Sequence, residues 1–226
     1  MKKITIIVLV LFLFGCNEDN PITIYTGPPL PIVGFRGPAT SSTHAEVDST
    51  KARVEGFNEF TLYLGDFANT EPSVSGNTYT WSLVREGVTY RLTGIMMPDS
   101  SFSWKLVLNG SQNGGTTYTN WTAFEGTTDA ARKNANWFIY AEHTTVKSSN
   151  FIWTVTSLSL IGTLNVYTNG VISGSTVITD NSNNTGEIRL YQGAVLTYRA
   201  VWISNGSGQY WYYNENGTIA SQGSWS

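Results

Sequence analysis

One stretch of the chain indicates the fold most clearly: Phe102-Ser103-Trp104-Lys105-Leu106-Val107-Leu108, followed directly by Asn109-Gly110. Large apolar residues at every second position lie on one face of a β-strand, and the intervening, mostly polar residues lie on the other. Asn-Gly supplies the positive φ angles of a type I′ turn, so the chain is expected to return as an antiparallel strand. The stretch therefore predicts a hairpin whose first strand carries Phe102 and Trp104 on the same side.

The same combination of strand pattern and turn recurs along the chain. Asn169-Gly170 and Asn216-Gly217 each follow a strand-like run, and Glu86-Gly87 marks a further tight return. Segments bounded by such turn signals number about a dozen between Phe57 and Trp225, and they do not alternate with helical patterns. The sequence thus predicts successive antiparallel hairpins.

Successive hairpins without long crossovers form an all-β antiparallel meander. Because a meander of many twisted strands must curl or close to protect its edge strands, we expect an up-and-down barrel or a strongly curled sheet. A two-sheet β-sandwich is the alternative. Four tryptophans stand 16 or 17 residues apart, which indicates a repeated hairpin unit or, in preference, aromatic residues at one depth of the core; they are Trp104, Trp121, Trp137 and Trp153.

The N-terminus has the pattern of an export signal. Lys2 and Lys3 precede an apolar run that ends in Leu13-Phe14-Gly15-Cys16. The run is shorter than the ~20 residues of a membrane span, and Leu13 stands where an ordinary secretory signal favours a small residue. The segment resembles the bacterial lipoprotein signal with its lipobox. That resemblance implies that residues 1–15 are removed, that Cys16 is acylated, and that the lipid anchors the chain in the outer membrane, facing the periplasm or the surface.

The acidic pair after Cys16 bears on the location of the chain, and its net charge bears on its partners. Glu18-Asp19 resembles the short acidic signal that sends some Gram-negative lipoproteins to the cell surface. Without Lys2 and Lys3, 11 basic residues face 16 acidic ones, a formal net charge of −5. Nucleic acid is a poor partner for such a chain, because phosphate binding needs a clustered basic surface.

Charged residues make up only 13% of the chain. The abundant Ser, Thr and Asn predict hydroxyl side chains on the solvent-exposed face of the sheet.

The mature chain is expected to have three parts. Residues 16–43 are rich in Pro and Gly and predict an extended linker after the lipidated cysteine. The Thr43-x-x-Glu46 spacing of a capping box predicts a short helix over residues 44–56. Residues 57–226 form the single β domain.

Catalytic motifs are scarce. The two histidines, His44 and His143, form no recognisable metal motif, and we expect no metal and no cofactor. His143 beside Glu142 is expected at the surface. A glycosidase would need two facing carboxylates, and the available ones lie on predicted loops; they include Asp66, Glu71, Glu125 and Asp129.

The aromatic run Tyr210-Trp211-Tyr212-Tyr213 is the main candidate for binding. Alternation sends Tyr210 and Tyr212 to one face of a strand and Trp211 and Tyr213 to the other. Each set is either a stacking platform for a ligand such as a sugar or part of the packing of the sheet. The candidate ligand residues are Trp211, Tyr212, Tyr210 and Trp121.

Three function classes are compatible with this sequence. The favoured one is a non-catalytic, membrane-anchored lipoprotein whose β domain binds a glycan or another envelope partner through exposed aromatic residues. The alternatives are a carrier that holds a lipid or other apolar ligand in a rolled sheet, and a hydrolase on a β scaffold that uses residues such as His143, Glu142, Asp129 and Glu125. Fold alone does not decide among them.

Overall fold

A computed structural model of the chain describes residues 30–112 and 115–226. One long helix, α1 (Ala45–Gly65), precedes the strands. The strands are β1 (Ser73–Ser75), β2 (Thr78–Arg85), β3 (Val88–Met96), β4 (Phe102–Ser111), β5 (Thr117–Thr128), β6 (Asn134–Tyr140), β7 (Lys147–Val155), β8 (Ser159–Thr168), β9 (Val171–Asn181), β10 (Gly186–Gln192), β11 (Val195–Trp202), β12 (Gly208–Tyr213) and β13 (Ile219–Trp225). The lipobox, Cys16 and Glu18-Asp19 lie outside the described residues.

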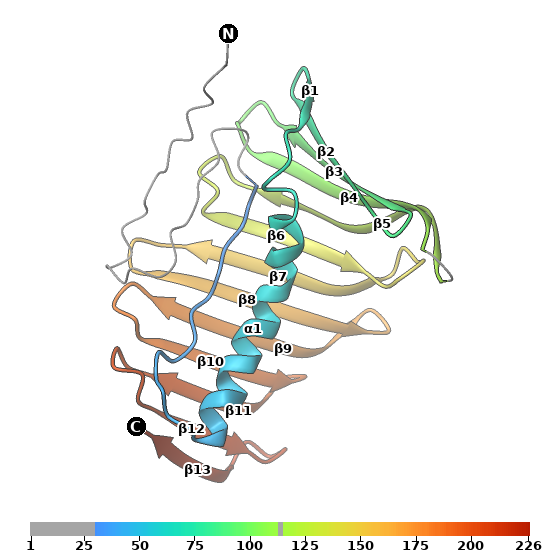
Figure 1. The fold of residues 1–226 in the computed structure, drawn as a ribbon. Helices are drawn as coiled ribbons and strands as arrows, with labels where there is room; N and C mark the ends of the chain where they lie inside the picture. The colour runs from blue at the N-terminus through green and yellow to red at the C-terminus, as the bar shows by residue number, and fades with distance from the viewer. Residues whose placement is uncertain (1–29, 113–114) are drawn as a thin grey trace.

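The strands form one antiparallel sheet in which each strand pairs with its neighbour in sequence, from β1 to β13. The predicted all-β antiparallel meander is therefore confirmed. Within the described residues β1 pairs only with β2 and β13 only with β12, so the sheet is open. It is a twisted, open sheet with α1 lying across one of its faces (Figure 1), rather than a closed barrel or a two-sheet sandwich.

The stretch that begins at Phe102 lies in β4 as expected. Its alternate residues Phe102, Trp104, Leu106 and Leu108 are all buried, and Lys105 between them is exposed. Phe102 and Trp104 thus point to the same side, as the alternation predicts.

The turn predictions have mixed outcomes. Glu86-Gly87 and Asn169-Gly170 are two-residue turns in which both residues have positive φ, so these hairpins are confirmed. Asn216-Gly217 also lies in a hairpin connection. Gly217 has a positive φ of 78° and is the last residue of a turn, which its N–H closes by donating a hydrogen bond to the carbonyl of Asn214.

Asn109-Gly110 is not a turn, and that prediction is wrong. β4 continues to Ser111, and Gly110 pairs with both Val88 and Tyr118 inside the sheet. A side chain at Gly110 would collide with the carbonyl oxygen of Gly87, and its φ of 122° is one that few other residues adopt. Glycine is needed here because the neighbouring backbone approaches closely, not because the chain reverses.

α1 is longer than the helix expected over residues 44–56. It continues to Gly65, and its N-cap is His44, whose Nδ1 accepts a hydrogen bond from the backbone of Glu46 at 3.2 Å; Thr43 is not the cap. Its buried stripe follows helical spacing to the last turn, and it consists of Val47, Thr50, Val54, Phe57, Thr61 and Leu64. Two threonines interrupt the apolar pattern of this stripe, and Gly56 suggests a stop, so the sequence pattern alone underestimated the helix.

Residues 30–44 pack on the domain instead of forming a free linker, which corrects the prediction for that part of residues 16–43. Phe35 is buried and meets the ring of Phe57 edge-on at 4.9 Å between centroids. Its backbone exchanges two hydrogen bonds with the side-chain amide of Asn58. Arg36 forms an ion pair with the buried Asp180 of β9, with Nη2 and Oδ1 2.7 Å apart.

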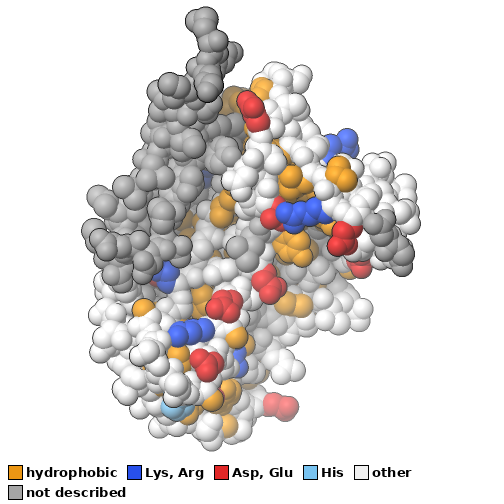
Figure 2. Space-filling view, in the orientation of Figure 1, with side chains coloured by type: hydrophobic (Ala, Val, Ile, Leu, Met, Phe, Trp, Pro, Cys, Tyr) orange, Lys and Arg blue, Asp and Glu red, His pale blue; other side chains and the backbone are white. Residues whose placement is uncertain are grey.

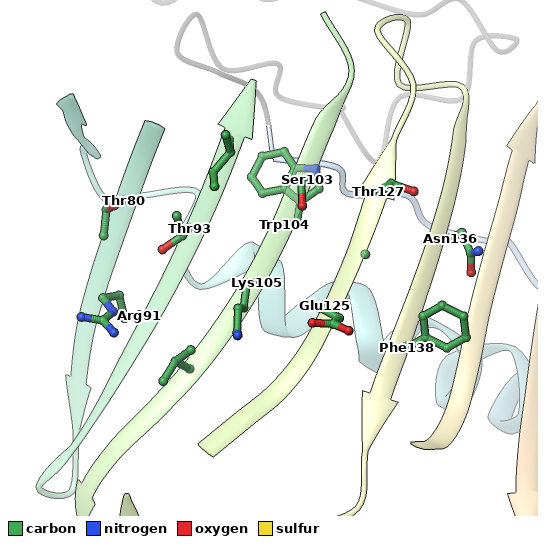
Figure 3. A pocket seen from close by; sticks show the side chains of 13 residues that line it. Thr80, Arg91, Thr93, Ser103, Trp104, Lys105, Glu125, Thr127, Asn136 and Phe138 are labelled. Carbon is green, nitrogen blue, oxygen red and sulfur yellow. The ribbon is translucent and has the colours of Figure 1, made fainter. Parts of the chain in front are cut away.

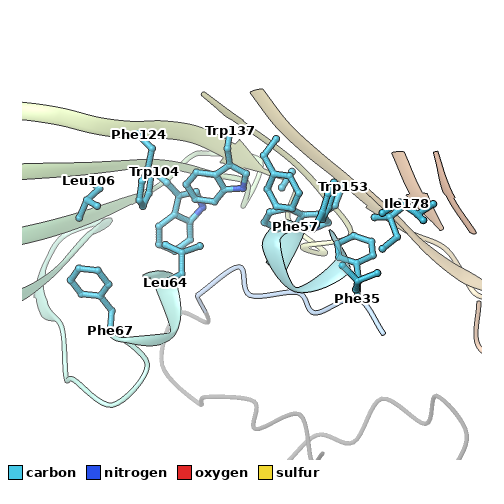
Figure 4. Close-up of a cluster of buried hydrophobic side chains, with 14 of the residues drawn as sticks. Phe35, Phe57, Leu64, Phe67, Trp104, Leu106, Phe124, Trp137, Trp153 and Ile178 are labelled. Atoms are coloured by element: carbon cyan, nitrogen blue, oxygen red, sulfur yellow. The ribbon is translucent and has the colours of Figure 1, made fainter. Parts of the chain in front are cut away.

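The core lies between α1 and the sheet (Figure 4), where three of the four regularly spaced tryptophans form one layer. The ring centroids of Trp104 and Trp137 are 6.3 Å apart, and those of Trp137 and Trp153 are 6.1 Å apart. This confirms the preferred interpretation of their spacing for these three residues. Trp121 is only half-buried and lies outside the layer.

Candidate binding groove

The face of the sheet opposite α1 is called the outer face here. Residues that pair across neighbouring strands point to the same side of the sheet. Such a row crosses the outer face from β2 to β7 and consists of Thr80, Thr93, Lys105, Glu125, Phe138 and Asn150. Three of the six carry hydroxyl or amide groups, and Lys105 and Glu125 carry charges.

Two adjoining pockets lie on this side of the sheet. The first has a volume of about 760 Å³ and lies over β2 to β6 (Figure 3). The second has a volume of about 830 Å³ and lies between β5 and the β6–β7 connection. Both are lined by Lys105 and Glu125, so together they form one elongated depression, which is called the groove below.

The first pocket has a mixed lining of polar and apolar groups. Its lining includes the hydroxyl and amide groups of Thr80, Thr93, Ser103, Thr127 and Asn136. In Figure 3, Lys105 and Glu125 extend from adjacent strands, and the ring of Phe138 lies beyond Glu125. The Nζ of Lys147 lies 3.5 Å from the centroid of the Phe138 ring, a cation–π contact that places a positive charge at the edge of the pocket.

The second pocket opens because β5 and β6 separate. Their pairing begins only at Phe124 and Ile139, so the first half of β5 is free of β6. The indole of Trp121 bridges the gap, and its Nε1 donates a hydrogen bond to the carbonyl of Thr144 at 3.1 Å. The bridge holds the β6–β7 connection in place and leaves Trp121 lining the pocket.

A group of aromatic rings stands at the far end of the second pocket. Tyr118 stacks on Trp121 with centroids 5.5 Å apart and on His143 with centroids 5.0 Å apart. Trp121 and His143 line the pocket themselves. The pocket therefore combines aromatic rings with several threonine hydroxyls.

Two tyrosine hydroxyls in this region donate to carboxylates and have raised pKa values. Burial, together with donation to Glu125, raises the pKa of Tyr140 to about 12. Donation to Glu142 at 2.6 Å, together with burial, raises the pKa of Tyr118 to about 12. Each phenol oxygen can still accept a hydrogen bond from a ligand, because a hydroxyl has two lone pairs.

The structure separates the four aromatic candidates predicted from the sequence. Tyr210 and Tyr212 face α1: the hydroxyl of Tyr212 donates to Glu46, and Tyr210 stacks on Trp225 with centroids 6.3 Å apart. Trp211 lies on the outer face, where the guanidinium carbon of Arg199 is 5.0 Å from its ring centroid. The alternation is thus confirmed, and of the four candidates only Trp121 lines the groove.

The residues considered for hydrolysis each have a hydrogen-bond or charged partner within the chain. His143 Nε2 and Glu142 Oε1 are 3.8 Å apart on an exposed turn. Asp129 accepts hydrogen bonds from Lys133 and Asn134 in the β5–β6 turn; burial alone would raise its pKa, but these hydrogen bonds outweigh burial and lower it. Glu125 lies within β5 and not on a loop, which corrects that prediction.

Several groove residues were not predicted as site residues, among them Lys105, Phe138 and Tyr140. Their outward positions could be read from strand alternation, but pairing of β4, β5 and β6 is what brings them together.

Across residues 30–112 and 115–226, no group of three or more His, Cys, Asp or Glu side chains is arranged to hold a metal ion. In the same residues, no helix is both long and apolar enough to cross a membrane.

Comparison with known proteins adds no further assignment. No protein-family model matches the chain, and no curated protein matches it.

Proposed function

We propose that this chain is an outer-membrane lipoprotein, anchored through Cys16, whose β domain binds a glycan in the groove without catalysing a reaction. The observation that carries the proposal is the lining of the groove, in which aromatic rings stand among many hydroxyl and amide groups. A sugar ring has apolar C–H faces that pack on aromatic rings and hydroxyls at its edge that exchange hydrogen bonds with polar side chains.

The elongated shape supports a chain-like ligand. The groove runs from β2 to the β6–β7 connection, and its two pockets together are much larger than one sugar unit. Polar, partly open sites of this kind bind through direct and water-mediated hydrogen bonds. The carrier alternative requires an apolar enclosure, whereas this groove is partly open and its lining mixes hydroxyl, amide and charged groups with apolar ones.

The acidic groups of the groove support binding over hydrolysis. Among the described lining residues, Glu125 is the single carboxylate, and it accepts the hydrogen bond of Tyr140. Glycoside hydrolysis ordinarily uses two carboxyl groups on either side of the bond that breaks.

Trp121 provides the sharpest test of the binding site. Detergent-solubilised protein is titrated with polysaccharides while its tryptophan fluorescence is recorded. Trp121→Ala is expected to weaken binding roughly ten-fold, about 1.4 kcal/mol, because the variant loses the apolar area that the indole and the sugar bury together. Tyr63→Ala is the control, since Tyr63 is 60% exposed on α1, on the other side of the sheet.

His143→Ala is the second variant, because His143 is exposed and its loss leaves the Trp121–Thr144 hydrogen bond in place. It is expected to weaken binding while the circular dichroism spectrum stays unchanged. Equal affinity of the wild type and of both groove variants, or no response to any polysaccharide, would rule out the groove as a glycan site.

A further inference from the structure

The outer face of the sheet carries an excess of positive charge. Outward-facing strand positions hold five basic residues, Arg91, Lys105, Lys147, Arg189 and Arg199, and two acidic residues, Glu125 and Glu187. The chain as a whole has a formal net charge of −3, so this excess of three positive charges runs against its composition.

The side that carries α1 holds charges of both signs. The helix has four acidic residues, Glu46, Asp48, Glu55 and Glu59, and two basic ones, Lys51 and Arg53. Figure 2 views this side and shows acidic and basic side chains interspersed along it. The excess of basic residues therefore favours the outer face as the side that binds a polyanion.

The acidic residues of the outer face already have partners. Glu125 accepts the hydrogen bond of Tyr140. Glu187 is bound by two arginines, with Arg199 Nε at 2.6 Å and Arg189 Nη2 at 3.1 Å.

Three exposed basic residues remain at the groove. Arg91 and Lys105 line the first pocket, and Lys147 lies against Phe138 at its edge. Within the part of the chain that the structure describes, none of the three forms an ion pair. Their charges are available to a ligand.

The spacing of the basic residues fits a long ligand better than a small anion. They lie on β3, β4, β7, β10 and β11. Strands in a sheet are ~4.8 Å apart, so the eight steps from β3 to β11 cover roughly 38 Å. Trp211 on β12 extends the row next to Arg199.

From this charge distribution we infer that the ligand is an acidic polysaccharide, whose carboxylate or sulfate groups pair with Arg91, Lys105 and Lys147 while its sugar rings lie in the groove. The inference rests on the proposed function and specifies the class of glycan. Lysine binds such a group as a point charge, and arginine binds it through a planar pair of N–H donors.

Polymers that differ only in charge test the inference. Affinity electrophoresis of the full-length protein is run with polygalacturonate, with its fully methyl-esterified form, with dextran and with dextran sulfate. We expect retardation by polygalacturonate or dextran sulfate and at least ten-fold weaker retardation by the matched neutral polymer. Retardation should decline as salt is added, since exposed charges are screened.

Two variants that each remove one exposed lysine charge locate the contact. Lys105→Gln, in the groove, is expected to weaken binding of the acidic polymer about three- to five-fold. Lys133→Gln, in the β5–β6 turn away from the groove, is expected to leave it unchanged.

The outcomes distinguish the inference from the function on which it rests. Preference for polygalacturonate identifies carboxylated sugars, and preference for dextran sulfate identifies sulfated ones; either supports the inference. Equal retardation by charged and neutral polymers overturns it but leaves glycan binding intact. Retardation by none of the polymers overturns both, and equal binding to anionic vesicles or single-stranded DNA overturns the inference in favour of unspecific attraction.

Discussion

At the residue scale, glycine and aromatic residues occupy complementary positions on the helix side of the sheet. Gly94 stands opposite Trp104, and a Cβ at this glycine would lie 2.6 Å from the indole ring. Gly162 stands opposite Trp153, and its missing side chain leaves space for the rings of Phe35 and Phe57. Because these glycines have no side chain, large aromatic rings can lie against the backbone of the strands at these positions.

Two glycine-to-alanine substitutions should change stability in opposite directions. In Gly162→Ala the new methyl group would lie 2.5 Å from Phe35 and 2.6 Å from Phe57, so we expect a loss of ~1–3 kcal/mol in the free energy of unfolding. Gly56→Ala adds its methyl group where nothing lies within 4 Å on α1, so a gain of ~1 kcal/mol is expected. Denaturant titration measures both, and two changes of the same sign would contradict this account.

At the element scale, α1 and residues 30–44 act together as the cover of the sheet. A helix of 21 residues is ~32 Å long, about the distance from β4 to β11. Its first turns contact β11 and β12, where Thr50 and Tyr198 share a hydrogen bond of 2.8 Å. Residues 30–44 run beside it (Figure 1) and are bound to it through Asn58.

The ion pair of Arg36 is expected to hold this cover in place. Arg36→Met leaves the carboxylate of Asp180, whose side chain is 6% exposed, without its charged partner, and should lower the free energy of unfolding by ~2 kcal/mol. Arg85→Met breaks the ion pair between Arg85, whose side chain is 54% exposed, and Asp66, whose side chain is 37% exposed. This variant should lower the free energy of unfolding by less than ~1 kcal/mol. Thermal unfolding of the two variants compares them, and equal losses would show that the buried position of Asp180 is unimportant.

At the scale of the whole molecule, the sheet has one covered side and one open side. The covered side contains the core, with residues such as Trp137, Phe151 and Ile178 almost fully buried. The open side carries polar rows, the groove and the excess of basic residues. A single-layer sheet can thus combine a stable core with a broad binding face.

Lipid attachment at Cys16 belongs to this scale, because it would fix the whole domain to a membrane. In a Gram-negative host fed a palmitate analogue that can be labelled, the wild-type chain should incorporate the label and fractionate with the outer membrane. Cys16→Ser should lose the label and appear in the soluble fraction, since the lipid chains supply most of the membrane affinity. A Cys16→Ser protein that stays membrane-bound would contradict the proposed anchor.

The sequence by itself determined the antiparallel meander, the burial of Phe102 and Trp104 on one side, the tight turns at Glu86-Gly87 and Asn169-Gly170, and the two faces of the Tyr210–Tyr213 run. These features depend on strand alternation and on turn conformations, which are local properties of neighbouring residues.

Only the tertiary structure decided that the sheet stays open, that α1 extends to Gly65, and that residues 30–44 pack on the domain. It also decided that Trp121, Lys105 and Glu125 share a groove, whereas Tyr210 and Tyr212 lie against the helix. Each of these depends on contacts between residues far apart in sequence, whose packing energy outweighs local preferences such as that of Gly56 to end a helix.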